Sequence, residues 1–155
     1  MSPELSVFLI SMLPISELRG AIPLAATVYN MPIWSAFICS VLGNLIPIFL
    51  VIFGLDLLIN KFLIHRIYIF NRFFTWLFER TKRRHSAKIE KWQDLALLTF
   101  VALPLPGTGA WTGALIAFVF GIPLRRAFPV ISLGVIIAGI IVSLITEGAI
   151  HLPFV

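Results

Sequence analysis

The sequence predicts an all-α integral membrane protein. The predicted fold is an inverted repeat. Each half is a re-entrant helical hairpin plus a spanning helix, and a central amphipathic interfacial helix lies between the halves. The 155 residues are 59% hydrophobic and 12% charged, against about 45–50% and about 25% in soluble domains. Two apolar segments broken by proline and glycine, 12–32 and 103–123, have the same order of features, and most lysines and arginines lie between them.

The chain is expected to form one membrane domain over residues 1–155, because it has no room for a separate soluble enzyme domain. We therefore expect that it is not an enzyme. The histidines His65, His85 and His151 have no cysteine or carboxylate at ligand spacing, so no metal site is expected. No Gly-rich phosphate loop is present, and no cofactor is expected.

The first repeat is predicted to cover residues 3–58. Its first apolar run, Leu5–Leu13, is too short to span a bilayer, so residues 5–29 are predicted to form a re-entrant hairpin. Residues 34–58 are predicted to form a spanning helix, because their length reaches ~37 Å, more than the ~30 Å hydrocarbon core.

Residues 59–94 are predicted to form a cytoplasmic, basic, amphipathic segment. Nine of the twelve lysines and arginines lie between Lys61 and Lys91, and cytoplasmic loops carry an excess of such residues. The basic cluster at 80–85 suits anionic lipid headgroups, or acts only as a determinant of topology. Nucleic acid is not expected as a partner, because the alternating apolar residues suit a membrane surface better.

The second repeat is predicted to cover residues 95–150, with a hairpin at 95–120 and a spanning helix at 127–147. Arg125 and Arg126 decide the topology. If both hairpins enter and leave on one face, these arginines are cytoplasmic, as the positive-inside rule favours. The prediction is a multi-pass protein of the cell membrane with both termini outside. The alternative is that the hairpins are kinked spanning helices.

Glu17 and Arg19 are the main site candidates, because ionisable groups at membrane depth are costly and face a cavity or a partner. They lie in a Pro/Gly turn that would allow them to pair, either for function or only to stabilise the loop. Ser16 is a candidate cap of the helix that follows. The candidate site also includes Gly20 and Pro23.

The second broken segment supplies backbone and hydroxyl groups instead of charges. Its candidates are Pro106, Gly107, Thr108, Gly109, Trp111 and Thr112. Prolines cannot continue a helix, and glycines permit close backbone approach. Thr108 is a candidate cap of the helix resuming at Ala110. Asn44, within the first spanning helix, is predicted to make a polar contact between helices or to face the hairpin.

Two motifs carry a family resemblance over nearly the whole chain: Glu17-Leu18-Arg19-Gly20-Ala21-Ile22-Pro23 and the stretch 104–113, PLPGTGAWTG. They resemble the family described as putative small multidrug export proteins. A looser resemblance to DedA (VTT-domain) proteins implies paired re-entrant hairpins and movement of lipids such as undecaprenyl phosphate. By that resemblance, Glu17 matches the acidic element of the first hairpin.

We predict a small transporter, a lipid flippase in type, that moves an amphiphilic, anionic, polyprenyl-phosphate-like substrate past a midplane site. Arg19 would neutralise the headgroup, and Glu17 would hold Arg19 and take up a proton. One alternative is a proton-coupled exporter of hydrophobic cations that uses Glu17, and another is a non-transporting scaffold. Membrane lipids, the substrate, protons and a second copy of the chain are the expected partners.

Overall fold

The computed structural model describes residues 2–58, 87–105 and 108–151. Within these ranges the chain is helical and contains no strand, which confirms the all-α prediction. The helices are α1 (Pro3–Ser11), α2 (Glu17–Thr27), α3 (Ile33–Leu58), α5 (Ala87–Ala102), α6 (Ala110–Val119) and α7 (Leu124–His151). Most of the predicted central segment, 59–86, lies outside the described residues.

The two described halves follow the same order of elements. Each has a short helix, a proline-containing break, a second short helix and a long helix. The second break of each half contains a left-handed residue, Asn30 (φ 49°) or Gly121 (φ 66°), and a proline follows two residues later, Pro32 or Pro123. Asparagine and glycine tolerate this conformation best, which explains why the chain turns there.

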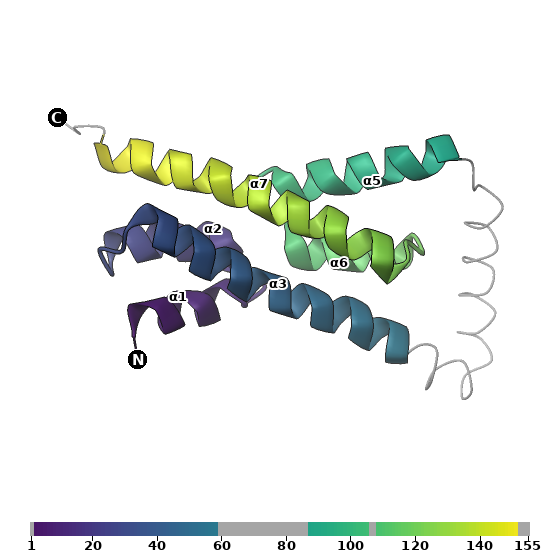
Figure 1. The fold of residues 1–155 in the computed structure, drawn as a ribbon, viewed down its shortest axis with the longest axis horizontal. Coiled ribbons are helices and arrows are strands. Elements are labelled where there is room, and N and C mark those ends of the chain that lie inside the picture. The colour runs from purple at the N-terminus through teal and green to yellow at the C-terminus, as the bar shows by residue number, and fades with distance from the viewer. Residues whose placement is uncertain (1, 59–86, 106–107, 152–155) are drawn as a thin grey trace.

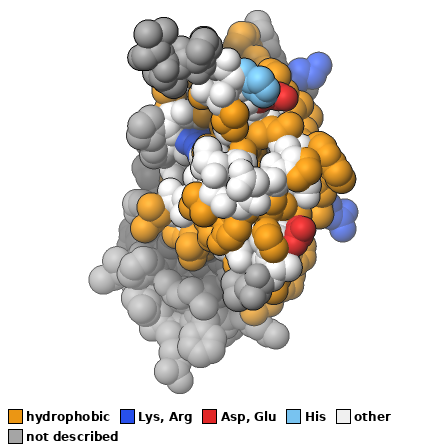
Figure 2. Space-filling view, turned by 90° about the vertical axis from the view of Figure 1, so that its left-hand side faces the viewer, with side chains coloured by type: hydrophobic (Ala, Val, Ile, Leu, Met, Phe, Trp, Pro, Cys, Tyr) orange, Lys and Arg blue, Asp and Glu red, His pale blue; other side chains and the backbone are white. Residues whose placement is uncertain are grey.

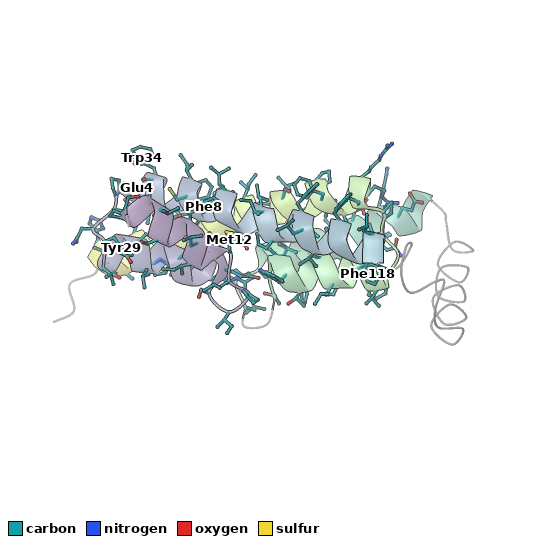
Figure 3. The ribbon with its side chains drawn as sticks, turned by 90° about the horizontal axis from the view of Figure 1, so that it is seen from below. Glu4, Phe8, Met12, Tyr29, Trp34 and Phe118 are labelled. Atoms are coloured by element: carbon teal, nitrogen blue, oxygen red, sulfur yellow. The ribbon has the colours of Figure 1, made fainter. Side chains whose placement is uncertain are left out.

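The long helices α3 and α7 run antiparallel along the molecule (Figure 1). The α1–α2 pair lies along one end of them, and the α5–α6 pair along the other. Contacts follow the same plan: α1 packs on α2 and α3, as α5 packs on α6 and α7, while α2–α7, α3–α6 and α3–α7 contacts join the halves. Figure 3 places Glu4 at one end and Met12 partway along, so α1 extends along only part of α3.

Among the described residues, two helices are long and apolar enough to cross a membrane, Ile33–Gly54 and Leu124–His151. They correspond to the predicted spanning helices at 34–58 and 127–147. The short helices α1 and α2 have 9 and 11 residues, which gives them lengths of only ~14 and ~17 Å. Each is therefore about half as long as a hydrocarbon core is thick.

The helix α5 begins at Ala87, eight residues before the apolar run that the sequence indicated at Leu95. An ion-pair cluster explains this difference. Arg126 of α7 bonds to Glu90 (2.8 Å) and Asp94 (2.9 Å), which lie one turn apart on α5. Residues 87–94 therefore belong to the helix that packs on α7 and do not lie in a separate segment.

Small residues sit where helices approach closely, as is common in membrane proteins. Gly43 lies against the Ser11 side chain and the Phe8 carbonyl of α1, and Gly134 lies against Val101 of α5. The outer faces are apolar instead of polar, with Leu42, Phe49 and many similar residues exposed. Figure 2 shows hydrophobic side chains over most of the described surface at one end. Such a surface is typical of a protein that contacts lipid.

We predict that Gly43→Ala lowers the stability of the purified protein by about 1–3 kcal/mol, because the added methyl would strike backbone that cannot move aside. Gly54→Ala on the same helix is the matched control, since nothing lies within 4 Å of that position. Alanine there should leave stability unchanged or raise it by about 0.5–1 kcal/mol. Thermal unfolding in detergent measures both, and equal melting temperatures would contradict the α1–α3 contact.

Candidate functional site

The breaks of the two helical pairs meet, and Arg19 joins them. Its Nη2 donates to the Leu103 carbonyl at 3.0 Å, and its Nη1 donates to the Leu105 carbonyl. Both carbonyls follow the end of α5 at Ala102. The C-terminal end of a helix carries unpaired carbonyls and a partial negative charge. A guanidinium is therefore well suited to this position.

Glu17 makes the complementary contact with the start of α6. Its Oε1 accepts a hydrogen bond from the Trp111 backbone N–H at 3.3 Å, and the neighbouring amide of Ala110 also interacts with the carboxylate. Helix N-termini present unpaired N–H groups and a partial positive charge. The Glu17 side chain, which is only 6% exposed, thus has its charge matched by the opposite half of the protein.

The backbone at this contact has positive φ on both sides, which is a strained conformation for Glu17 and an accessible one for the glycine opposite it. Glu17 has φ 46°, a left-handed value that is unusual for glutamate. Gly109 has φ 151°, and a side chain there would strike the Glu17 carboxylate. Residues in such conformations persist where the surrounding structure holds them, and they cluster at functional sites. Because Gly109 has no side chain, the Glu17 carboxylate can approach the start of α6.

Glu17 and Arg19 do not form the predicted direct ion pair, although their charges still interact at longer range. In the described part of the chain the ion pairs belong to Arg126, and Glu17 and Arg19 each bind the opposite break instead of each other. Both residues lie in the first turn of α2, where side chains two positions apart do not face each other. Backbone carbonyls, and not Glu17, hold Arg19.

The two predicted caps are also wrong. The Ser16 side chain makes no capping bond to α2, and Ser16 itself has helical backbone angles. The cap residue of α6 is Gly109, and the Glu17 carboxylate takes the role expected of Thr108. The Thr108 hydroxyl instead bonds within its own break, to the carbonyls of Leu103 (2.8 Å) and Leu105 (2.9 Å).

An open cleft of about 280 Å³ lies where the breaks meet. It combines one carboxylate, one guanidinium and three hydroxyls with apolar residues. Its lining comprises Pro14, Ile15, Ser16, Glu17, Arg19, Pro104, Leu105, Thr108 and Thr112. The structure thus brings together five of the predicted site residues, namely Ser16, Glu17, Arg19, Thr108 and Thr112.

The other predicted site residues lie around the cleft or away from it. Gly109 and Trp111 hold Glu17, and the Trp111 indole donates to the Met12 carbonyl at 3.2 Å. Gly20 and Pro23 lie farther along α2 and do not line the cleft. Pro106 and Gly107 lie outside the described residues.

Asn44 is completely buried in α3, but neither its Oδ1 nor its Nδ2 has a partner among the described residues. It does not line the cleft, and the predicted polar contact between helices is therefore wrong. Ser40, one turn earlier, is also fully buried and unpartnered within the described ranges. A buried amide without partners costs about 1–3 kcal/mol.

Sequence reasoning missed the groups that hold Arg19, which are the carbonyls of Leu103 and Leu105. A carbonyl occurs in every residue, so the sequence carries no direct signal for it. The only available clue was that a broken helix leaves carbonyls that need donors. No group of three potential metal ligands occurs in the described ranges.

Comparison with known proteins gives a family match. Residues 17–141 match the family model described as "Putative small multi-drug export protein". This range contains Glu17, Arg19, the break between α5 and α6 and the starts of both long helices, and it begins directly after the break between α1 and α2. No curated protein and no solved structure matches the chain, and the similarity to DedA proteins therefore stays a prediction.

We predict that Gly109→Ala destabilises the protein by about 1–3 kcal/mol, because alanine is strained at this φ and its methyl meets Glu17. Adding Glu17→Ala should restore part of this loss, since the shortened side chain leaves room for the methyl. Gly148→Ala is the control, because its surroundings are open. Urea or thermal unfolding measures the set, and purely additive losses would contradict the Gly109–Glu17 contact.

Asn44→Leu should raise stability by about 1–3 kcal/mol, because it replaces an unpaired buried amide with an apolar side chain of the same branching and number of heavy atoms. Asn30→Leu is a useful counterpart. Asn30 is exposed and has φ 49°, so leucine there should lower stability. Thermal unfolding distinguishes the two variants, and a lower melting temperature for Asn44→Leu would mean that the amide has a partner.

Proposed function

We propose, from the premise that the chain belongs to the family described as putative small multi-drug export proteins, that it is a membrane transporter for an amphiphilic molecule with an anionic headgroup. The observation that carries this proposal is the cleft where two broken helical pairs meet, with Glu17 and Arg19 in its wall. Broken helices that meet at the midplane are a common form of transport site.

In this proposal α1–α2 and α5–α6 are re-entrant hairpins, and the two halves are inverted repeats. Three observations support it: α1, α2 and α6, with 9, 11 and 10 residues, have about half the length of a bilayer core, the contacts within the two halves correspond, and α3 and α7 run antiparallel (Figure 1). The start of α1 and the end of α7 lie at the same end of the molecule. We place that end outside and the end with Arg125 and Arg126 in the cytoplasm.

The hydrogen-bonding groups of the cleft favour an anionic headgroup. Amides at the start of α6 already balance the charge of Glu17, whereas the acceptors of the Arg19 guanidinium are neutral backbone carbonyls. Arginine stays charged at any physiological pH and binds phosphate and carboxylate groups well. The hydroxyls of Ser16 and Thr112 add further donors beside it.

The same contacts give the transport cycle a physical basis. Hydrogen bonds of Glu17 and Arg19 hold the two breaks together. An anion that competes for Arg19 therefore weakens this connection. Protonation of Glu17 would weaken it too, because a neutral acid interacts less with the positive helix end. The second candidate function, proton-coupled export of hydrophobic cations, is favoured by the buried carboxylate in the cleft wall.

The test is movement of a fluorescent polyprenyl phosphate between the leaflets of proteoliposomes. Arg19→Ala should lower the initial rate about tenfold or more, because a hydrogen bond to a charged group is worth about 1.5–3 kcal/mol. Arg125→Ala is the matched control, since Arg125 is exposed and does not line the cleft. Its rate should equal that of the unsubstituted protein.

Two other outcomes would contradict the anionic substrate. If the folded protein moves no phosphate but expels tetraphenylphosphonium along a proton gradient, and Glu17→Gln abolishes this, the second candidate is correct. If both substitutions leave every flux unchanged while neutralisation of Arg80, Lys82, Arg83 and Arg84 removes the biological effect, the chain is a scaffold.

A further inference from the structure

A second cavity, about 220 Å³ in volume, lies between the helices α5 and α6. Its lining is apolar except for one amide side chain, and it comprises Gln93, Ala96, Leu97, Phe100, Ile116, Phe120 and Ile122. None of these residues lines the charged cleft. Neither the proposed headgroup site nor the ion pairs of Arg126 use this cavity.

The cavity and the cleft lie on the same face of the α5–α6 pair. On α6, the cleft residue Thr112 is followed at four-residue steps by Ile116 and Phe120. On α5, Gln93, Leu97 and Phe100 follow one face at steps of four and three, and the cleft residue Pro104 comes two residues after the helix ends at Ala102. Residues three and four positions apart lie on one face of a helix. The distance along the axis from Thr112 to Ile116 is ~6 Å.

Polarity changes sharply along this face. Beside the break, the wall is formed by Arg19, Thr108 and Thr112, and one turn away it is formed by Phe100 and Ile116. An amphiphile has the same division between a charged head and an apolar chain. Burial of a methylene group is worth about 0.8 kcal/mol, so a chain in this cavity would add affinity in proportion to its buried length.

We propose that the α5–α6 cavity binds the hydrocarbon chain of the transported amphiphile while the headgroup lies in the cleft. This inference rests on the proposed function and adds to it a substrate with a single apolar chain attached directly to the head. The hydrocarbon chain of the substrate, and not a bulk lipid, is the occupant, because the cavity lies along the same face of α6 as the headgroup site.

The experiment uses two photoreactive dodecyl phosphates, with a diazirine either beside the phosphate or at the chain end, and the full-length protein in nanodiscs. Mass spectrometry after illumination locates the labelled residues. The head probe should label the cleft, for example at Thr112. The chain-end probe should label the cavity, at Phe100, Ile116 or Phe120. Labelling by both should fall in Arg19→Ala.

Ala96→Trp should fill the cavity and lower chain-end labelling about tenfold, since it excludes about two methylene groups or more. Labelling by the head probe should persist. Leu115→Trp is the matched control, because Leu115 is on α6 but 47% exposed and outside both sites. Competition in the unsubstituted protein is a second measurement: dodecyl phosphate should displace the chain-end probe at least about tenfold better than octyl phosphate, because burial of only two of its four additional methylenes gives about 1.6 kcal/mol.

The outcomes separate this inference from the proposed function. If the head probe labels the cleft but the chain-end probe labels the exposed faces of α3 and α7, the chain does not occupy the cavity and the inference is wrong. Equal competition by the two chain lengths would also overturn it. If labelling by the head probe is unchanged in Arg19→Ala, the proposed headgroup site is wrong and the inference fails with it.

Discussion

The need to satisfy the backbone groups exposed where the helices break is the constraint on which the rest of the structure depends. Each helical pair stops partway along the molecule and leaves amides and carbonyls at its break. In an apolar environment these groups must find partners within the protein. Here the carbonyls after α5 receive the guanidinium of Arg19, and the amides at the start of α6 receive the carboxylate of Glu17. Two charges and one broken pair are thereby stabilised together, and the Thr108 hydroxyl adds further bonds to the same carbonyls.

This arrangement makes the two halves unequal partners. The first break supplies both charged side chains, and the second supplies the backbone groups and the small residue, Gly109, that allow them to approach. The surrounding helices still have corresponding contacts in both halves. The two halves thus share a framework but differ in the residues at their breaks. Both charged side chains of the cleft come from the first half.

The composition of the chain and the positions of its prolines and glycines were sufficient to predict much of the fold. Long apolar runs indicated α3 and α7 to within a few residues at most ends, and paired prolines indicated the two breaks. The N-terminal part of α5 was not predictable, because it depends on Arg126, more than 30 residues away in the sequence. The acceptors of Arg19 could not be predicted for a different reason, because every residue has a backbone carbonyl. Pairing of Glu17 with Arg19 was the simplest expectation for neighbouring charges, but the helical start of α2 turns them apart.

The contacts of Glu17 and Arg19 also impose an order of events during synthesis. The ribosome makes both charged residues long before it makes Leu103, Leu105 and Trp111, to which they bind. Until those residues have been made, Arg19 lacks the Leu103 and Leu105 carbonyls and Glu17 lacks the Trp111 amide. The left-handed turn at Glu17 is then held only by bonds within the first half, such as the one from its N–H to the Leu13 carbonyl. The contacts that hold Glu17 and Arg19 are therefore completed only after residues 103–111 of the second half have been made.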